Sequence, residues 1–564
     1  MSKAVLICFK DPSFNHFTPK DIETLSNRLM PDNIKVISPL IISDKGILIG
    51  VFNPNDSLLK KENSICLGNI INPRKDWWIP HSEMPNGSFA LFRVNENEVE
   101  LVSDAVASRT IWYTKNKDFF IASTSQRAIV HFLKDFSPNL EVFSWMLSSG
   151  TIGPNLSWDK RIKRLSGDSQ LILNRKSWEL QINTQFIKFT PINLPPNEFK
   201  ERIRNAFEYT FNNLEFDDSK WYLTLSGGYD SRIILLLLKD RYNLKCITWG
   251  LNSSINEKHN DAYIAKELAN YYNLEHTYFN TNISAEPIEK IFRRFIIAGE
   301  GRVDHIEGYM DGFKIMKTIY ENGIFGILRG DEAFGWTPIK DAWEVRKTIG
   351  VVLLSDIDNL RNFEGNILKK QTISENFIQR DNESLEAWRD RLYHEFRIPN
   401  ILAALNDLKL SYIEVINPLL SKRILEIVRT MPDSLRTDKS LYKEIVHSLS
   451  PNIPFAKYPA IEERARILRN PKVVELLSKE LNTFMARKLL SDKFIDYLLE
   501  NMSVRGKKKS LKDRIKPFIP KSIQRIIYKK FIATKIDFNI LAFRAYLIYK
   551  MTQILNGDAM VLNR

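Results

Sequence analysis

One short string of the chain combines residue types that could bind a phosphate. It reads LSGGYDS and spans residues 225–231, between an apolar strand pattern and an apolar helix pattern. The two adjacent glycines allow a tight turn and leave the backbone N–H groups unobstructed. A helix that begins here directs its N-terminal amides and its dipole toward an anion. The string therefore predicts a phosphate-binding loop, with these candidate ligands: Leu225, Ser226, Gly227, Gly228, Asp230 and Ser231.

Asp230 indicates that a metal ion belongs to the same site. A carboxylate next to a bare phosphate is repelled unless a divalent cation such as Mg2+ bridges the two. A second pair of acids, Asp331 and Glu332, follows about 100 residues later in segment 324–336, IFGILRGDEAFGW, directly after Gly330. Two acids at the carboxyl end of a strand suit a cation site at the mouth of a parallel sheet. Taken alone, the second pair of acids is as typical of a solvated turn as of a cation site.

The elements around these loops have the pattern of an α/β domain. Apolar strand patterns occur at 221–226, 244–250, 276–279 and 322–328, and helix patterns occur at 231–239 and 260–272. Strands that alternate with helices predict a parallel sheet with helical crossovers. From about residue 340 onward the patterns are almost entirely helical.

The first third of the chain has a different pattern. Short runs rich in β-branched and aromatic residues recur there, separated by turn residues, and they predict a mostly antiparallel β domain. The three prolines within residues 191–199 can continue neither a central strand nor a helix interior, so they mark the boundary between the two patterns. The expected strands are 46–52, 88–94, 99–102, 111–113, 119–122 and 169–173.

The two loops together resemble a known family. The string at 225–231 resembles the pyrophosphate loop of the ATP pyrophosphatases, which split ATP into AMP and pyrophosphate. Segment 324–336 resembles the GxGxDExFxGY loop of the asparagine synthetases, although its first glycine is missing and Trp336 replaces the tyrosine. Residues 414–420 are similar to that family's ExRxPFLD segment, and residues 439–443 to KxLLR. The resemblance extends from about residue 40 to about residue 480.

The first domain resembles the glutaminase domain of the same family. Residues 86–90, 101–104, 110–113 and 120–123 are similar to its DGxFA, DxxGxxPLYY and FASE segments. That domain is an N-terminal-nucleophile hydrolase sandwich, and it needs a cysteine as the first residue of the mature chain. Here Ser2 stands at that end, and the nearest cysteine, Cys8, lies in an apolar run typical of a packed strand. Ser2 as a replacement nucleophile is the less favoured alternative.

The resemblance implies an α/β fold with two domains and an extension. Residues 1–195 would be a degenerate class II glutamine amidotransferase-like domain, an α+β sandwich of the Ntn-hydrolase type. Residues 196–500 would be an asparagine-synthase-like PP-loop domain, with a parallel sheet of the adenine nucleotide alpha hydrolase type and a helical C-terminal part. Residues 501–564 would be a basic helical extension.

The resemblance also implies an ATP-dependent, AMP-forming carbon–nitrogen ligase with Mg2+. A small-molecule or peptide carboxylate would attack the α-phosphorus of ATP, and an amine or ammonia would then displace AMP from the acyl carbon. Gly330 would bind phosphate together with the 225–231 loop. Lys457, in a segment similar to LPxxIxxRxK, would stabilise developing negative charge. The remaining implied residues are Thr248 and Gly250 at the adenosine, Asp230 and Asp331 at the metal, and Glu332 in catalysis.

Several alternatives remain open at the level of the sequence. The amine could be free ammonia, a second molecule, or part of the substrate itself, as in the β-lactam synthetases and lasso-peptide cyclases, which also lack the cysteine. A PP-loop enzyme that modifies nucleic acid is disfavoured by the β domain and by the absence of zinc-ligand cysteines. A non-catalytic scaffold is disfavoured by the intact 225–231 loop, Asp331 and Lys457. The motif at 299–302, GEGR, reads as a helix cap and turn, with the acceptor pocket as its alternative place.

The charge of the chain limits the classes of partner that we expect, and its cysteine content limits the cellular compartment. Lys and Arg number 81 against 67 Asp and Glu, a net charge of +14, and residues 505–530 supply +10 of it with eleven basic residues and one acid. That segment is either a solvated tail or a docking surface for an acidic partner or a membrane face. We expect no nucleic-acid partner, and the sequence does not indicate an oligomeric state. Three dispersed cysteines and no long apolar stretch predict a soluble cytoplasmic protein.

Overall fold

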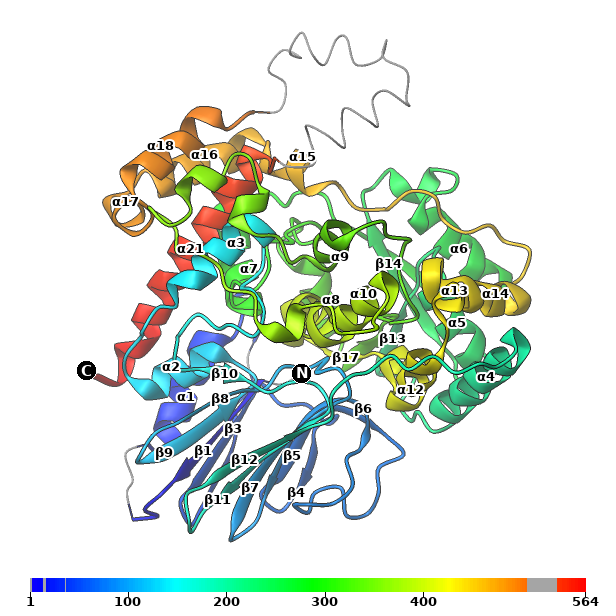
Figure 1. Cartoon of the computed structure of the whole chain (residues 1–564), viewed down its shortest axis with the longest axis horizontal. Coiled ribbons are helices and arrows are strands. Elements are labelled where there is room, and N and C mark those ends of the chain that lie inside the picture. The colour runs from blue at the N-terminus through cyan, green and yellow to red at the C-terminus, as the bar shows by residue number, and fades with distance from the viewer. Residues whose placement is uncertain (1–2, 14–16, 36, 505–534, 564) are drawn as a thin grey trace.

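Two six-stranded antiparallel sheets form the first part of the chain, and they pack face to face below a parallel sheet (Figure 1). The computed structural model describes residues 3–13, 17–35, 37–504 and 535–563. Ser2 and the basic segment 505–530 therefore lie outside the described residues. The first sheet has the order β10 (Lys163–Arg164), β8 (Trp112–Lys115), β9 (Phe119–Ser123), β1 (Lys3–Phe9), β3 (Ile47–Phe52) and β2 (Leu40–Asp44). The second has the order β12 (Leu180–Thr184), β11 (Ser169–Asn174), β7 (Glu98–Ser103), β6 (Asn86–Val94), β5 (Ser64–Ile71) and β4 (Leu59–Lys61).

Strand β1 shows why the sandwich has helices on its outer side. Successive side chains of a strand point to opposite faces. Leu6 and Cys8 pack against the second sheet, whereas Val5 and Ile7 pack against the first helices. All seven residues of β1 are buried, because both faces are covered. The covering helices are α1 (Pro19–Leu29), α2 (Gln126–Leu133) and α3 (Leu140–Ser149).

A five-stranded parallel sheet forms the second part. Its order is β15 (His276–Asn280), β14 (Lys245–Gly250), β13 (Trp221–Thr224), β16 (Gly326–Leu328) and β17 (Glu414–Ile416). The chain fills the sheet on one side of β13 with β14 and β15, and then returns to add β16 and β17 on the other side. The strand order therefore reverses between β13 and β16. In open α/β sheets, ligands bind at such a switch point, outside the carboxyl ends of the strands.

Helices cover both faces of the parallel sheet. Neighbouring strand residues alternate between the two faces, so Leu223, Cys246 and Leu328 meet one helical layer, while Ile247 and Ile327 meet the other. One layer consists of α4 (Pro196–Asn212), α5 (Asp230–Leu238), α6 (Asp261–Tyr271) and α14 (Ser440–Leu449). The other layer includes α7 (Ile288–Gly299), α8 (Lys314–Glu321) and α11 (Ala403–Leu410).

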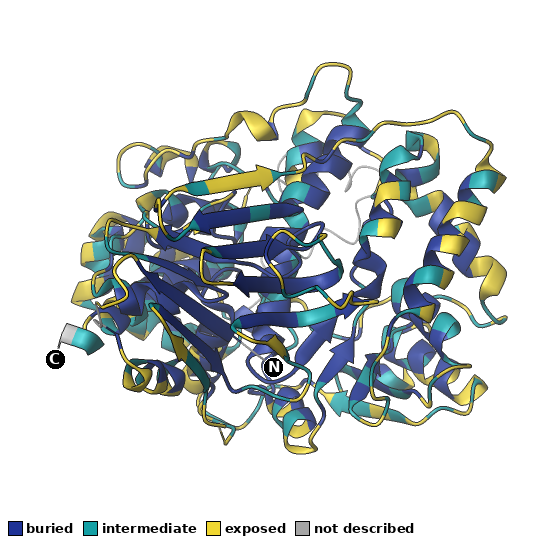
Figure 2. Ribbon diagram, turned by 90° about the horizontal axis from the view of Figure 1, so that it is seen from below, coloured by how far each residue is buried: buried dark blue, intermediate teal, exposed yellow. Residues whose placement is uncertain are grey.

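Exposed residues lie mostly on loops and on the outward faces of helices (Figure 2). The chain contains further helices. They are α9 (Ala342–Ile349), α10 (Leu385–Leu392), α12 (Lys422–Thr430), α13 (Asp433–Arg436), α15 (Arg464–Leu468), α16 (Pro471–Leu481), α17 (Phe484–Leu490) and α18 (Asp492–Asn501). The last long helix, α21 (Phe538–Ala559), packs against α2 and α3 of the first part and against α15, α16 and α18 of the second. Within the described ranges, no helix combines the length and the apolarity that crossing a bilayer requires.

The predicted fold class is confirmed. The chain has an antiparallel sandwich, then a parallel-sheet α/β domain, and a helical C-terminal part. One detail differs, because the region after residue 340 was expected to be almost entirely helical and contains strand β17. This strand has only three residues, and it forms because β16 offers it a parallel partner. The domain boundaries at 195 and 500 stay predictions.

Candidate active site

The loop between β13 and α5 is held in shape by its own polar groups. The Ser226 amide donates a hydrogen bond to Ser231 Oγ at 2.9 Å, and the two serine hydroxyls are 2.8 Å apart. The Gly227 amide donates to Asp261 Oδ1 on α6 at 2.8 Å, and the Gly228 amide donates to Ser226 Oγ at 3.2 Å. The turn is therefore preformed, with Asp261 as an anchor outside the motif.

Helix α5 begins at Asp230, and no side chain caps its first amides. The first N–H groups of a helix have no partner within the helix, so they are available to an anion. Gly330, at the end of β16, lies directly against this helix end. A Cβ atom on Gly330 would lie 2.8 Å from Asp230 Cβ and 3.0 Å from the Ser231 nitrogen. Only glycine lets the two loops approach this closely.

These two loops enclose a cavity of about 240 Å³ at the switch point between β13 and β16. Seven of the residues predicted from the sequence line it: Leu225, Ser226, Asp230, Ser231, Thr248, Gly330 and Asp331. The other lining residues are Thr224, Ile247, Trp249, Asp261 and Arg329. The structure thus brings residues from three strand ends, far apart in sequence, to one cavity.

Five predicted site residues do not line this cavity. A Cβ on Gly227 would meet Ala456 Cβ and Ile264 Cβ at 2.8 Å, so this glycine permits close packing of the loop. Gly250 has the same role against Ala460, whose Cβ would lie 2.5 Å away. At Gly228 a Cβ would meet only Ser226 Oγ, at 3.4 Å. Glu332 is paired with Lys439, behind Asp230. Lys457 is exposed.

Lys457 belongs to a segment that supports the loop. The Ala456 amide donates to the Gly227 carbonyl at 3.0 Å, and the Lys457 amide donates to the His259 carbonyl at 2.9 Å. The backbone of this segment is therefore attached to the phosphate loop and to the start of α6. The Lys457 side chain lies in solvent next to these contacts.

Asp230 is the most perturbed group of the site. Burial, and then the charge of Glu332, raise the pKa of the Asp230 carboxyl to about 7, while Lys439 acts in the opposite direction. Lys439 Nζ lies 2.5 Å from Glu332 Oε1 but approaches Asp230 Oδ1 only to 3.9 Å. Asp230 Oδ1 is buried and accepts no hydrogen bond from the described residues. A cation next to this oxygen would satisfy it.

Asp331 differs from Asp230 because both of its oxygens are already engaged. Arg329 Nε donates to Asp331 Oδ1 at 2.9 Å, and Asn406 Nδ2 donates to Asp331 Oδ2 at 2.9 Å. The described part of the chain contains no ready-made group of three or more metal-binding side chains. The oxygen donors of Asp230 and Asp331 still fit Mg2+, which binds through one or two carboxylates together with water and phosphate oxygens.

The sequence reasoning did not assign roles to Lys439 and Asn406. Lys439 opens the segment similar to KxLLR, so a signal for it existed, but its ion pair with Glu332 depends on how α14 packs. Asn406 lies on α11, and nothing in the local sequence connects it with Asp331. Arg329 stands just before Gly330, and no role was predicted for it either.

A second cavity, of about 250 Å³, adjoins the first and shares Trp249 and Arg329 with it. The two cavities therefore lie on either side of these two side chains. The GEGR motif does not line either cavity. Its predicted role as a cap and turn is confirmed, because α7 ends at Gly299 and Glu300 adopts the left-handed conformation with φ 52°.

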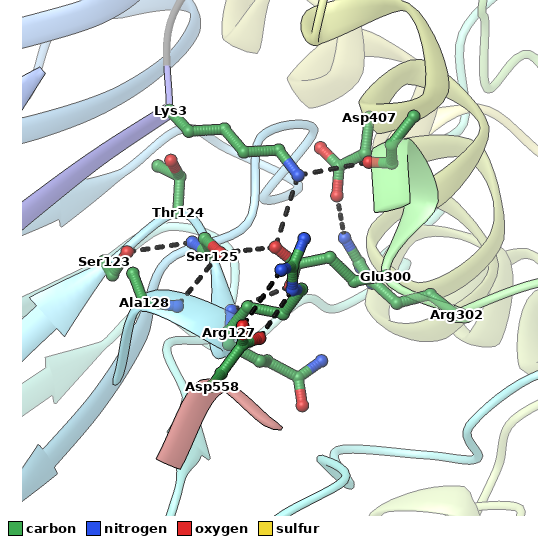
Figure 3. A network of polar contacts seen from close by, with 12 residues as sticks. Lys3, Ser123, Thr124, Ser125, Arg127, Ala128, Glu300, Arg302, Asp407 and Asp558 are labelled. Atoms are coloured by element: carbon green, nitrogen blue, oxygen red, sulfur yellow. Dashed lines mark hydrogen bonds and ion pairs between the residues drawn. The ribbon is translucent and has the colours of Figure 1, made fainter. Parts of the chain in front are cut away.

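Glu300 instead takes part in a buried network at the start of β1 (Figure 3). Lys3 Nζ donates to the Ala298 carbonyl at 3.1 Å and contacts Glu300 Oε1 at 3.2 Å. Glu300 also accepts from the Gln126 amide at 2.8 Å and from the Ser125 hydroxyl. The beginning of the sandwich is therefore joined to the loop after α7 by a charge pair that is almost fully buried.

Cys8 is a packed strand residue, as the sequence predicted. It is buried between the two sheets, and burial raises the pKa of its thiol to about 11. A thiol with this pKa is protonated at neutral pH and is a poor nucleophile. Burial likewise raises the pKa of Cys246 to about 12 and that of Cys66 further.

Comparison with known proteins identifies the second part of the chain. Residues 202–453 match the family model described as asparagine synthase. No curated protein matches the sequence. One similar solved structure is titled "structure of the allosteric regulatory enzyme of purine biosynthesis", with 9% identity and a TM-score of 0.22 over 43% of this chain. The chain spans 64% of the length of that protein.

A second similar structure is a glutamine phosphoribosylpyrophosphate amidotransferase from B. subtilis complexed with ADP and GMP. It has 10% identity and a TM-score of 0.20, over 60% of this chain and 83% of its own. TM-scores this low carry no weight for the site. The match at residues 202–453 implies an ATP-dependent, amide-forming ligase, and it covers β13, β14 and β16 with both loops of the cavity. Residues 202–453 of this chain are an asparagine synthase domain.

Proposed function

We propose that this protein adenylates a carboxylate with ATP, releasing pyrophosphate, and joins the acyl group to an amine or to ammonia. One observation carries the proposal: the uncapped start of α5, the two serines, Asp230 and Asp331 all meet in one cavity at the switch point of the parallel sheet. Amide donors suit the phosphates, and carboxylates suit the metal that accompanies them.

The residues of the chain have separate tasks in this reaction. The α5 amides and the Ser226 and Ser231 hydroxyls bind phosphate oxygens, and Thr248 lies where the adenosine enters. Asp230 and Asp331 would hold Mg2+, which neutralises phosphate charge when bound. A carboxylate oxygen bonds to the α-phosphorus while the bond from the α-phosphorus to the pyrophosphate oxygen breaks. The amine then bonds to the acyl carbon, loses a proton, and AMP leaves.

Charged side chains around the loop balance the acids of the site and the negative charge of the reaction. They are Lys439, Glu332 and Lys457. Lys439 balances the acids behind the loop, because it contacts Glu332 and lies near Asp230. Lys457 is the candidate for stabilising the negative charge that develops during adenylation or amide formation. Its segment is bonded to the phosphate loop, so a small movement of this segment would bring the ammonium toward the cavity.

We further propose that the amine does not come from glutamine through a cysteine. The support is the buried, protonated Cys8 within β1, together with Lys3 and Glu300 at the start of that strand. Free ammonia or an amine-bearing molecule then supplies the nitrogen. Assays with ammonium and with glutamine as alternative donors compare these sources, and faster product formation with glutamine would contradict this part of the proposal.

ATP–pyrophosphate exchange tests the adenylation step. Purified protein is supplied with Mg2+, ATP, labelled pyrophosphate and a panel of carboxylates, and we expect exchange that depends on the carboxylate. Asp230→Asn should lower the exchange rate by about 100-fold or more, the usual size of losing one electrostatic contact to the transition state. Asp240→Asn is the matched control, because Asp240 lies just beyond the other end of α5 and is exposed. Equal rates for the two variants would refute the proposal.

A further inference from the structure

The second cavity contains an amine that has no carboxylate partner. Lys409, on α11, lines this cavity and is 3% exposed. Its Nζ donates to the Leu405 carbonyl at 2.8 Å and lies 5.7 Å from the centre of the Tyr309 ring. No acid of the described residues lies within ion-pair distance of it. A lysine buried in this way is costly to charge, and burial together with nearby Arg329 holds its pKa well below the ordinary range.

The other charged groups of the cavity are already neutralised. Both oxygens of Glu307 accept from Arg464, through Nε and Nη2, at 2.9 Å each. Arg329 is paired with Asp331 at 2.9 Å. Lys409 is therefore the basic group of the cavity that lacks an acidic partner among the described residues, and its amine has N–H bonds beyond the one that Leu405 accepts. An anion that enters the cavity would favour the charged form of this amine and accept its remaining hydrogen bonds.

Most of the remaining wall of the cavity is apolar, although His305 also lines it. Trp249, Met316, Leu405 and Ile461 contribute to the apolar part, together with the ring of Tyr309. The volume of about 250 Å³ limits what can enter. A cavity of about 150 Å³ accommodates benzene, so this one has room for a single aromatic or branched apolar group with its acid. A small hydrophilic acid would leave these walls in contact with water, which is unfavourable.

We propose that this cavity binds the carboxylate substrate, that Lys409 is the residue that binds its carboxylate, and that the substrate carries one aromatic or branched apolar group. The inference rests on the proposed function, because the bound carboxylate would have to meet the α-phosphorus of ATP beside Trp249 and Arg329, which line both cavities. It adds the class of the acid, which could be a free acid or the terminal residue of a peptide. It also makes Lys409 a specificity-determining residue.

Calorimetry with defined probes tests this assignment without turnover. The probes are 3-phenylpropanoate, its neutral counterpart 3-phenylpropanamide, and aspartate as a hydrophilic acid. We expect 3-phenylpropanoate to bind at least tenfold more tightly than either of the others. Lys409→Met should remove the tenfold preference for the acid over the amide. The variant should not be less stable to heat, because it removes a buried amine and keeps a side chain of similar length.

A matched control separates a local effect from a general loss of charge. Lys422→Met also removes a partly buried lysine, which is paired with Asp168 at 2.9 Å and lines neither of the two cavities. This control should keep the full preference for 3-phenylpropanoate. The inference is overturned if aspartate binds as tightly as 3-phenylpropanoate, if Lys409→Met keeps the preference, or if none of the probes binds.

Measurements of ATP–pyrophosphate exchange distinguish a wrong assignment of the second cavity from a failure of the proposed function. If hydrophilic acids alone support ATP–pyrophosphate exchange and Lys409→Met leaves their apparent KM unchanged, adenylation stands and the assignment of the cavity is wrong. If 3-phenylpropanoate binds through Lys409 but no carboxylate supports exchange, the cavity binds apolar acids and the proposed reaction is wrong. Lys409→Arg, which keeps the charge, should retain part of the binding of 3-phenylpropanoate.

Discussion

The raised pKa of the Asp230 carboxyl makes the free energy of unfolding depend on pH. Its carboxyl has a pKa of about 7 in the folded chain, against an ordinary value of 3.8. Between about pH 4 and pH 7 the folded state therefore binds more protons at this group than the unfolded state does. Stability falls with rising pH wherever the native state binds the additional proton. This group thus makes the unfolding free energy decrease from about pH 4 to about pH 7.

Asp230→Asn should remove that contribution. We expect the wild-type protein to lose stability relative to the variant as the pH rises across this interval, with urea unfolding followed at several pH values. Comparing the two proteins cancels the titration of groups that do not interact with Asp230. Asp240→Asn should follow the wild-type curve, because its carboxylate is exposed. Parallel curves for Asp230→Asn and the wild type would show that Asp230 is not protonated in the folded state.

Gly330→Ala tests the close contact between the two loops. The new methyl group would lie 2.8 Å from Asp230 Cβ and 2.9 Å from the Asp230 carbonyl carbon, so the start of α5 must move. Overpacking of this kind costs about 1–3 kcal/mol. We expect the affinity for ATP, measured by calorimetry, to fall at least tenfold.

Gly557→Ala serves as the control for the Gly330 substitution. Gly557 lies within α21, where the nearest atom to a new Cβ is Arg28 Nη2 at 3.4 Å. Alanine is a better helix former than glycine, so this variant should be neutral or slightly more stable. Unchanged ATP binding in Gly330→Ala would mean that the two loops can separate without cost.

Elements with a strong local pattern were predictable, and elements that depend on distant partners were not. The apolar runs at 221–226 and 244–250 became β13 and β14, because a strand buried on both faces is apolar throughout. Strand β17 has three residues and no pattern of its own. The π-helix at Tyr393–Leu402, which contains Pro399, was likewise not predictable, because the period of 3.6 residues that indicates an α-helix does not apply to it.

The residues of the candidate site fall into the same two groups: those that a local pattern predicts and those whose position depends on distant partners. The phosphate loop could be predicted because the whole string at 225–231 lies between a strand and a helix, and Asp331 because its segment resembles a loop of the asparagine synthetases. Lys439, Asn406 and Lys409 come from helices α14 and α11 or from the turn before them, and their places depend on packing between elements. The strand order that puts β16 beside β13 is a property of topology, which no local segment encodes.

Helix α21 is attached to the first helices by one buried carboxylate. Asp558 is fully buried, and its oxygens accept from Arg127 Nε at 2.7 Å and from Arg28 Nε at 2.8 Å. Asp558→Asn leaves the buried Arg127 guanidinium without its counter-charge. Breaking a buried pair in this way costs about 3–5 kcal/mol. We expect a clear fall in Tm, measured by circular dichroism.

The surface pair Arg487–Asp492 is the matched control for α21. Asp492 is 78% exposed, and exposed ion pairs contribute about 0–1 kcal/mol. Asp492→Asn should therefore leave the Tm nearly unchanged. A similar Tm for both variants would mean that α21 is held by its apolar face alone.

At the scale of the whole molecule, buried contacts join the sandwich to the asparagine synthase domain. Contacts between the two parts are buried and charged, such as Lys3–Glu300 and Arg109–Glu414, and the second of these reaches β17. Polar contacts of this kind cannot be exposed without a penalty, since each leaves a charge unpaired. The sandwich can therefore be required for folding independently of any chemistry of its own.

Removal of residues 1–195 tests this dependence. Fourteen of the 22 residues of α21 are buried, and the helix lies partly against α2 and α3 of the removed part. Arg544 on α21 donates to the Leu147 carbonyl at 2.7 Å, so truncation would also leave this buried group unsatisfied. We expect residues 196–564 to be insoluble or to unfold without a cooperative transition, as followed by circular dichroism during heating. Co-expression of residues 1–195 as a separate chain should restore solubility, whereas a truncated protein that melts cooperatively at the wild-type temperature would show that the ligase domain folds independently.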